Sequence, residues 1–182
     1  FTWPETAGTG INAFNFCKYL YQKSIPFTLL TFNRNLIYKK KEVIDNIKIT
    51  RIPYFNKSLI HRLISLPLVI LYYLKFILGS KCIIIYGGKI IGFEFIILLS
   101  KIFNKKVIFQ SQLMGVDDIG TLVISRSGVI RSFYKSLFRN INIYFSINNE
   151  FSNTYKKIYK DDLKILQIPQ GVDTNKFKSV TG

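Results

Sequence analysis

The sequence has few of the residues on which metal and nucleophile chemistry usually depends. It holds one histidine, His61, and two cysteines, Cys17 and Cys82, in 182 residues. A single histidine excludes a multi-histidine metal centre and leaves little basis for a Ser-His-Asp or Cys-His nucleophile system. The two distant cysteines give neither a disulfide framework nor a zinc-binding spacing, so we expect a reducing compartment.

Acidic residues are also scarce. Ten Asp and Glu stand against 26 Lys and Arg, which gives a formal net charge of +16. A charge this positive favours partners that carry phosphate, such as nucleic acid, anionic lipid or a phosphorylated substrate. The cations are mostly lysines, spread along the chain among many Ile, Asn, Phe and Tyr residues. A plain compositional bias is therefore an equally good explanation.

The start of the chain carries no visible secretory signal peptide. It begins Phe1-Thr2-Trp3-Pro4, with no initiator methionine and no basic leader. We interpret residues 1–3 as the end of a strand that begins outside this sequence, and we expect both ends of the chain to be cut.

A long continuous hydrophobic run is missing too. The most apolar stretch, 59–78, contains Pro67 and is flanked by charge, so its continuous part falls short of the ~20 apolar residues of a membrane span. A buried core helix is one interpretation. The other is a helix that rests on anionic lipid headgroups, with Arg62, Tyr72 and Lys75 as the membrane contacts.

What the sequence does have is an alternation of strand and helix patterns. Apolar runs that suit buried strands occupy 27–32, 47–55, 81–88, 106–112, 141–147 and 163–168. Helical spacing occupies 11–23, 58–78, 89–103, 129–139 and 149–160, whereas 33–46 and 113–128 lack either pattern. Strands separated by helices are typical of βαβ units. We therefore predict an α/β fold: a Rossmann-like, open, mostly parallel sheet of six strands, or seven with 1–3, with helices on both faces.

Ligands of such sheets bind at the carboxyl ends of the strands, so the loops there are candidate sites. The loop PETAGTG, 4–10, precedes a helix, and its Gly8, Thr9 and Gly10 would let an anion approach the helix-terminal N–H groups. A simple tight turn before a helix is the alternative. A second candidate pair, Tyr86 and Gly87, ends the strand in CIIIYGG.

A third loop, FQSQLMGVDD, follows the strand at 106–112. Gln112 leaves the strand, and the adjacent carboxylates Asp117 and Asp118 could supply a base, a hydroxyl binder or a metal ligand. They could equally cap the next helix or form an Asx turn. Because neighbouring residues seldom point the same way, we expect at most one functional aspartate.

Four segments in order carry a resemblance to a known family. They are AGTGINAFNFCKYL, CIIIYGGKIIGFEF, KKVIFQSQLMGVDD and the terminal INIYFSINNEFSNTYKKIYKDDLKILQIPQGVDTNKF. Together they resemble the N-terminal domain of GT-B glycosyltransferases of the family 4 type. The terminal IPQGVD is similar to the family's IPNGVD ending, with Gln170 where Asn is usual.

The resemblance implies a Rossmann-like, acceptor-side domain at 1–168 and the start of an inter-domain linker at 169–182, with the second domain absent. Pro169, Gly171 and Asp173 would shape the hinge. The full-length protein would transfer a sugar from a nucleotide-sugar to a glycan or lipid-linked acceptor, and this fragment alone would be inactive.

The resemblance also implies the site. The residues that would bind donor or acceptor are Gly8, Thr9, Gly10, Tyr86, Gly87, Gln112 and Asp117. Many family members have a His-Gly pair near the place of Gln112, whose amide could bond a sugar hydroxyl but could not act as a general base. We expect no metal, no cofactor beyond the nucleotide-sugar, no nucleic acid partner, and a cytoplasmic protein that can lie on the inner membrane face. The alternative from another class is a basic Rossmann-like module that binds nucleotides or nucleic acid without catalysis.

Overall fold

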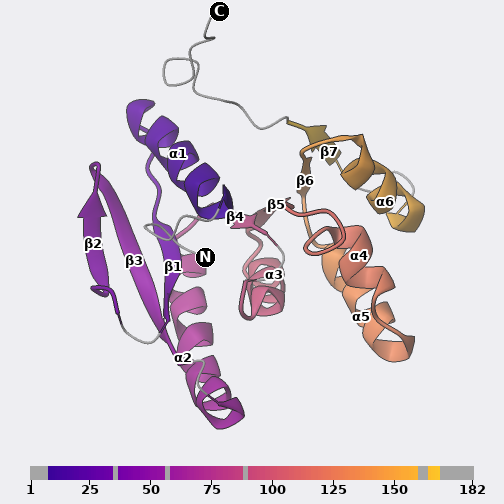
Figure 1. The fold of residues 1–182 in the computed structure, drawn as a ribbon, viewed down its shortest axis with the longest axis horizontal. Coiled ribbons are helices and arrows are strands. Elements are labelled where there is room, and N and C mark those ends of the chain that lie inside the picture. The colour runs from indigo at the N-terminus through magenta and orange to yellow at the C-terminus, as the bar shows by residue number, and fades with distance from the viewer. Residues whose placement is uncertain (1–7, 35–36, 56–57, 88–89, 160–163, 169–182) are drawn as a thin grey trace, which may run out of the picture.

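The fold is known from a computed structural model that describes residues 8–34, 37–55, 58–87, 90–159 and 164–168 (Figure 1). The helices are α1 (Gly8–Gln22), α2 (Leu59–Leu78), α3 (Phe93–Ile102), α4 (Ile119–Ile124), α5 (Gly128–Phe138) and α6 (Asn149–Tyr159). The strands are β1 (Leu29–Arg34), β2 (Lys41–Ile44), β3 (Ile47–Tyr54), β4 (Cys82–Tyr86), β5 (Lys106–Gln110), β6 (Ile143–Ser146) and β7 (Lys164–Gln167). The predicted α/β class is confirmed.

The strands form two small sheets, whereas we predicted one sheet of six or seven strands. The first sheet has the order β1-β3-β2, and the second has the order β4-β5-β6-β7 with all neighbours parallel. The prediction of one continuous sheet is wrong for the described residues because β1 and β4, the strands that would join the halves, do not pair with each other. Residues 1–3, the expected extra strand, lie outside the described residues.

A hairpin occupies part of the stretch 33–46, for which we predicted no strand. β2 pairs antiparallel with β3, and Ile44 lies opposite Ile47. The two residues between them, Asp45 and Asn46, have φ values of 49° and 66°. Two consecutive positive φ angles are the geometry of a tight two-residue hairpin turn, and Asp and Asn adopt it more readily than most residues.

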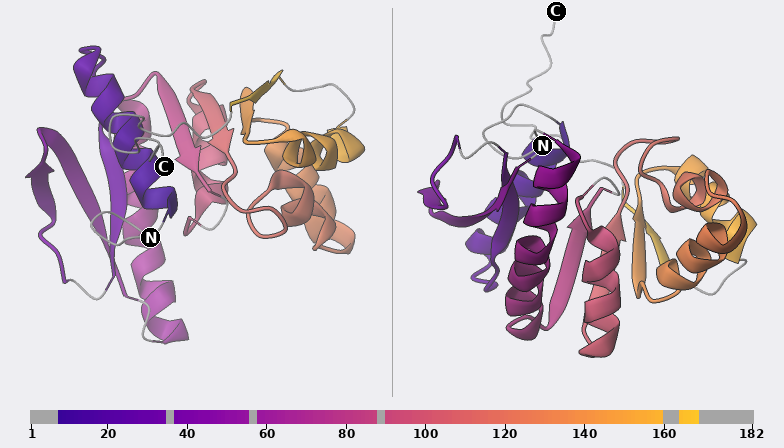
Figure 2. Two further views of the ribbon diagram at one scale, coloured as in Figure 1. Left: turned by 45° about the horizontal axis from the view of Figure 1, so that its top comes forward. Right: turned by 90° about the horizontal axis from the view of Figure 1, so that it is seen from below.

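α1 and α2 lie on opposite faces of the first sheet, as the predicted fold requires. Ile47 and Ile49 of β3 pack in one cluster with Phe14 of α1. Ile52 and Tyr54, in the other phase of the same strand, belong to the cluster that contains α2. Because side chains of a strand alternate between faces, the two helices cover different sides, as Figure 2 shows.

The larger core fixes the second sheet under α3 and α5. Phe109 of β5 is fully buried, and its ring lies 5.7 Å from that of Phe138 on α5. Phe93 of α3 stacks on Phe138 at 5.8 Å. Burying each such ring contributes about 2–3 kcal/mol, so this cluster stabilises the packing of α3 and α5 on β5.

α2 is a single helix with Pro67 inside it. Its N-cap is Ser58, whose hydroxyl accepts the His61 backbone N–H at 3.3 Å. Among the residues whose placement is described, no helix combines the length and the apolar character needed to cross a membrane.

Candidate functional site

The first turn of α1 contains the glycines of the predicted binding loop. The helix begins at Gly8, earlier than the predicted start at residue 11. Gly8, Thr9 and Gly10 are therefore helical, and the N–H groups of a first turn have no partner within their own helix. Gly10 is buried, whereas the side chain of Thr9 lies outside the described part.

A side-chain hydrogen bond connects this turn to the loop after β5. The Asn12 Nδ2 amide donates to Oε1 of Gln112 at 3.4 Å, across 100 residues of sequence. One turn further along α1, the Phe16 ring lies 6.1 Å from the ring of Tyr86, at the end of β4. The first two turns of α1, the end of β4 and the loop after β5 thus meet at the carboxyl edge of β4 and β5.

The end of β4 needs glycine for its geometry. Gly87 is buried and has a φ of 82°, and its N–H donates to the Gln110 carbonyl at 2.8 Å. A side chain there would be strained. Burial, and secondarily the nearby Cys17, raises the pKa of Tyr86, so its phenol stays protonated and can donate a hydrogen bond. Burial also raises the pKa of the Cys17 thiol, to about 11, which keeps it unreactive.

Asp117 organises the loop that follows β5. Its Oδ1 accepts the backbone N–H groups of Gln112 at 3.0 Å and Leu113 at 2.8 Å. Its backbone carbonyl accepts the Ser111 hydroxyl at 3.2 Å, and the Tyr144 hydroxyl in turn donates to Ser111 at 2.9 Å. Asp117 is 5% exposed, so any effect of this carboxylate on a ligand acts through the shape of the loop.

Asp118 caps the next helix. Its Oδ1 accepts the Thr121 N–H at 2.7 Å, and its Oδ2 accepts the Gly115 N–H at 2.8 Å. Of the roles that we left open for the two aspartates, the structure shows the helix cap, which Asp118 forms. Among the described ranges, no group of three or more His, Cys, Asp and Glu residues is arranged to hold a metal ion.

The sequence did not point to Asn12, Ser111 or Tyr144. Asn12 is a polar residue just after a glycine-rich helix start, which is a weak signal, and the other two have none. The predicted hinge at Pro169, Gly171 and Asp173 lies outside the described residues.

The residues of α2 that we predicted as membrane contacts differ from one another in exposure. Lys75 is exposed, whereas Tyr72 is half-buried, with the amine of Lys40 5.5 Å from the centre of its ring. The side chain of Arg62 is not among those described. Tyr72 and Lys75 border a groove of about 800 Å³ between α2 and the first sheet.

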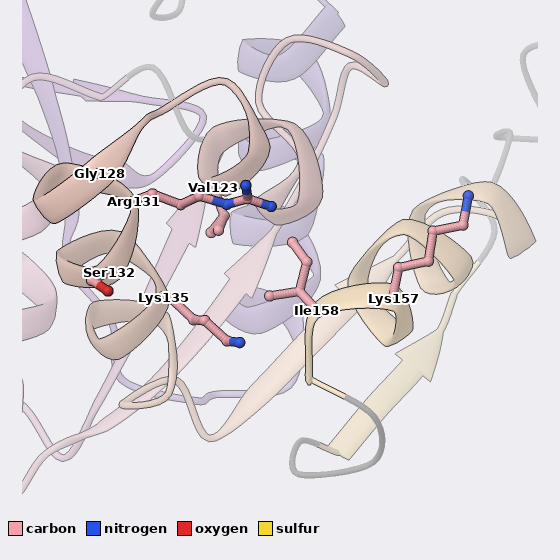
Figure 3. A pocket seen from close by; sticks show the side chains of 7 residues that line it. All are labelled: Val123, Gly128, Arg131, Ser132, Lys135, Lys157 and Ile158. Atoms are coloured by element: carbon pink, nitrogen blue, oxygen red, sulfur yellow. The ribbon is translucent and has the colours of Figure 1, made fainter.

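A smaller hollow of about 300 Å³ lies between α5 and α6, far along the chain from the predicted site. It is lined by Val123, Gly128, Arg131, Ser132, Lys135, Lys157 and Ile158 (Figure 3). Figure 3 shows the Lys157 amine directed away from Arg131 and Lys135. The three cations therefore do not converge on one point.

Comparisons with known proteins give no relative: no protein-family model, curated protein or solved structure matches the chain.

Proposed function

We propose that this chain is the acceptor-side domain of a GT-B type glycosyltransferase. The enzyme moves a sugar from a nucleotide-sugar to a glycan or lipid-linked acceptor. The proposal rests on the resemblance of four ordered segments to that family and on one observation of geometry. The Asn12–Gln112 hydrogen bond places the first turn of α1 against the loop after β5, beside Tyr86.

The chemistry of this edge suits a phosphate-linked sugar. Helix-terminal N–H groups at Gly8–Gly10 favour an anion such as a diphosphate. The Gln112 amide has both a donor and an acceptor for sugar hydroxyls, and the Tyr86 phenol is a second neutral donor. With no general base among these groups, the site binds and orients, and a partner domain supplies the remaining contacts.

Binding tests the proposal on the full-length protein. We would titrate it with UDP- and GDP-sugars and assay transfer to lipid-linked and soluble glycan acceptors. Gln112→Ala should raise the dissociation constant of the donor at least about tenfold, because the loss of one well-formed hydrogen bond to a ligand costs about 1.4 kcal/mol. Gln22→Ala, at the other end of α1 and exposed, is the matched control and should bind like the wild type. Equal affinity of both variants, or no transfer with any donor, would refute the proposal.

We further propose that α2 lies on an anionic membrane surface. Its outward side carries a stripe at helical spacing: Ile60, Ile64, Leu68, Leu71 and Leu78, which are 67%, 69%, 38%, 61% and 52% exposed. Over 20 residues the helix is about 30 Å long. Lysines line the adjoining groove at 40, 41, 48 and 75, with Glu42 as its one acidic lining residue. An apolar stripe beside lysines matches the chemistry of anionic headgroups over acyl chains.

Vesicle flotation tests this contact. Ile64→Glu should lower binding to vesicles that contain phosphatidylglycerol, and Lys75→Glu should lower it about tenfold or more, since each nearby cation contributes about 1 kcal/mol. Ile102→Glu, on α3 and 71% exposed, is the matched control. Equal binding to neutral and anionic vesicles would remove the electrostatic part of the proposal.

The net charge of +16 favours one other function, a module that binds nucleic acid. Titration with single-stranded RNA distinguishes this module from the glycosyltransferase domain. Tight binding with a steep dependence on salt would favour that module over the glycosyltransferase.

A further inference from the structure

The groove between α2 and the first sheet has two walls of different chemistry. Side chains of a strand alternate between faces, so Lys48 and Thr50 lie on the same face of β3 as Ile52, which packs in the core with α2. Lys41 of β2 pairs with Thr50 and shares this face. The opposite wall is mainly apolar and is formed by Leu68, Leu71, Tyr72, Lys75 and Phe76 of α2. The sheet wall therefore suits an anion, and the helix wall suits a hydrocarbon chain.

Four lysines bring positive charge to this groove. Lys41 and Lys48 are diagonal neighbours across the β2–β3 hairpin, about 7–8 Å apart on one face. The Lys40 amine lies 5.5 Å from the centre of the Tyr72 ring, and Lys75 follows Tyr72 by three positions on the same side of α2. Within the described part of the chain, none of these four amines is paired with a carboxylate.

The acidic residue that lines the groove does not offset this charge. Residues along β2 alternate between faces, so the side chain of Glu42 lies on the other side of the sheet from that of Lys41. There its carboxylate lies 2.6 Å from a guanidinium nitrogen of Arg51, which is fully buried. Among the described residues, the groove thus presents lysines without a competing carboxylate, and it favours an anionic ligand.

Apolar side chains are exposed in the groove as well. Val43 of β2 is 62% exposed, and Leu68 and Leu71 of α2 are 38% and 61% exposed. Leu68 and Leu71 also belong to the outward stripe of α2, so the groove opens onto the surface that faces the membrane in the contact proposed above. Its volume of about 800 Å³ is within the range of sites that hold one small ligand. A lipid that enters from the membrane would meet apolar side chains first and cationic ones next.

We propose that the groove binds one molecule of an anionic lipid whose head group is a phosphate monoester. The chain of the lipid lies along Leu68 and Leu71, and its phosphate lies among the lysines of the sheet wall. A monoester carries a charge of about −1.5 to −2 near pH 7, more than the single charge of a phosphodiester. Lysine amines bind such a group as point charges, and the hydroxyls of Thr28 and Thr50 are further donors. The inference rests on the proposed membrane contact of α2 only for the supply of lipid.

The lipid is an anchor and not the sugar acceptor, because the groove lies apart from the proposed transfer site. Thr28 comes directly before β1, Lys48 is the second residue of β3, and Lys75 lies in the last turn of α2, so the groove reaches the amino edge of the sheet. Tyr86 and Gln112, by contrast, lie at the carboxyl edge, together with the beginning of α1.

Calorimetric titration of the full-length protein tests the proposal without a membrane. The ligands are dihexanoyl phosphatidic acid, a monoester, and dihexanoyl phosphatidylglycerol, a diester, both below the concentration at which they form micelles. We expect phosphatidic acid to bind at least about tenfold more tightly, since it brings additional charge to several lysines. Lys48→Glu should raise the Kd of phosphatidic acid at least about tenfold. Lys101→Glu, at an exposed position on α3 outside the groove, is the matched control and should bind like the wild type.

Two further measurements separate the groove from the membrane contact and from a plain phosphate site. Ile64→Glu should lower vesicle flotation but leave the Kd of phosphatidic acid unchanged, because Ile64 belongs to the stripe and does not line the groove. Glycerol 3-phosphate, which has the phosphate without the chains, should bind at least about tenfold more weakly than phosphatidic acid. Equal affinity for the monoester and the diester, equal affinity with and without chains, or an unchanged Kd in Lys48→Glu would overturn the proposal. Binding of phosphatidic acid by a protein that does not float with anionic vesicles would support the groove and refute the membrane contact alone.

Discussion

Replacing Asp117 tests how the loop after β5 is held in place. In Asp117→Ala, the N–H groups of Gln112 and Leu113 lose the oxygen that accepts both, at 3.0 and 2.8 Å. Each unsatisfied amide costs about 1–3 kcal/mol when buried, but Leu113 is 56% exposed and water can reach part of this loop. We therefore expect a loss of about 2–3 kcal/mol in the free energy of unfolding. Asp117→Asn keeps an acceptor oxygen without its charge and should lose about 1 kcal/mol.

Urea denaturation of both variants measures these losses, and thermal unfolding should show a Tm about 5–10 °C lower for Asp117→Ala. Asp45→Asn is the control, because it weakens a surface ion pair of 2.6 Å to Lys18, which contributes no more than about 0.5 kcal/mol. Both Asp117 variants should also weaken nucleotide-sugar binding, since the loop carries Gln112. An Asp117→Ala protein within about 0.5 kcal/mol of the wild type would refute the role that we assign to this carboxylate.

Three further changes probe the fold. A Cβ on Gly120 would lie 2.7 Å from Cβ of Thr154, so Gly120→Ala should push α4 from α6 and cost about 1–3 kcal/mol in urea denaturation, although Ala favours a helix. Glu42→Ala removes the carboxylate 2.6 Å from the fully buried Arg51; since Glu42 is 34% exposed, we expect a loss of about 2 kcal/mol, less than for a fully buried pair. Burial, then the hydrogen bond to a glutamate, raises the pKa of Tyr134 to about 12. The phenol of the unfolded chain ionises at a lower pH than the folded one, so the free energy of unfolding falls as the pH rises from about 10 to 12. Tyr134→Phe should make the slope of this free energy against pH shallower, by the equivalent of about one bound proton, in denaturation curves at these pH values.

Most elements could be predicted because burial leaves a direct pattern in the sequence. Ile83–Ile85 form a short run of β-branched residues, which favours a strand in the core, and the helical spacing of 58–78 gave the bounds of α2 within one residue. β2 was missed because Lys41–Ile44 is short and half-exposed, so its residues lack a continuous apolar run. The pair Asp45-Asn46 was the usable signal, since both residues favour a two-residue hairpin turn.

The site could be predicted only in part, because pairing between distant segments has no local signal. The glycine loop, Tyr86 and Gln112 followed from the rule that parallel sheets bind ligands at their carboxyl edge. The contact between Asn12 and Gln112 joins residues 100 positions apart, and no spacing predicts it.

α1 contributes both to the binding site and to the packing of the first sheet, but different residues serve each. Asn12 faces the loop after β5, whereas Phe14, which is 2% exposed, packs on the first sheet. Asn12→Ala should therefore weaken nucleotide-sugar binding and leave the exchange of β1 and β4 amides unchanged. Phe14→Ala should cost about 3–5 kcal/mol and raise exchange in β1 before β5, because the helix then no longer covers that face. If Asn12→Ala alone released the amides of β1, the first turn would be holding the sheet together, and the binding role that we assign to it would lose its support.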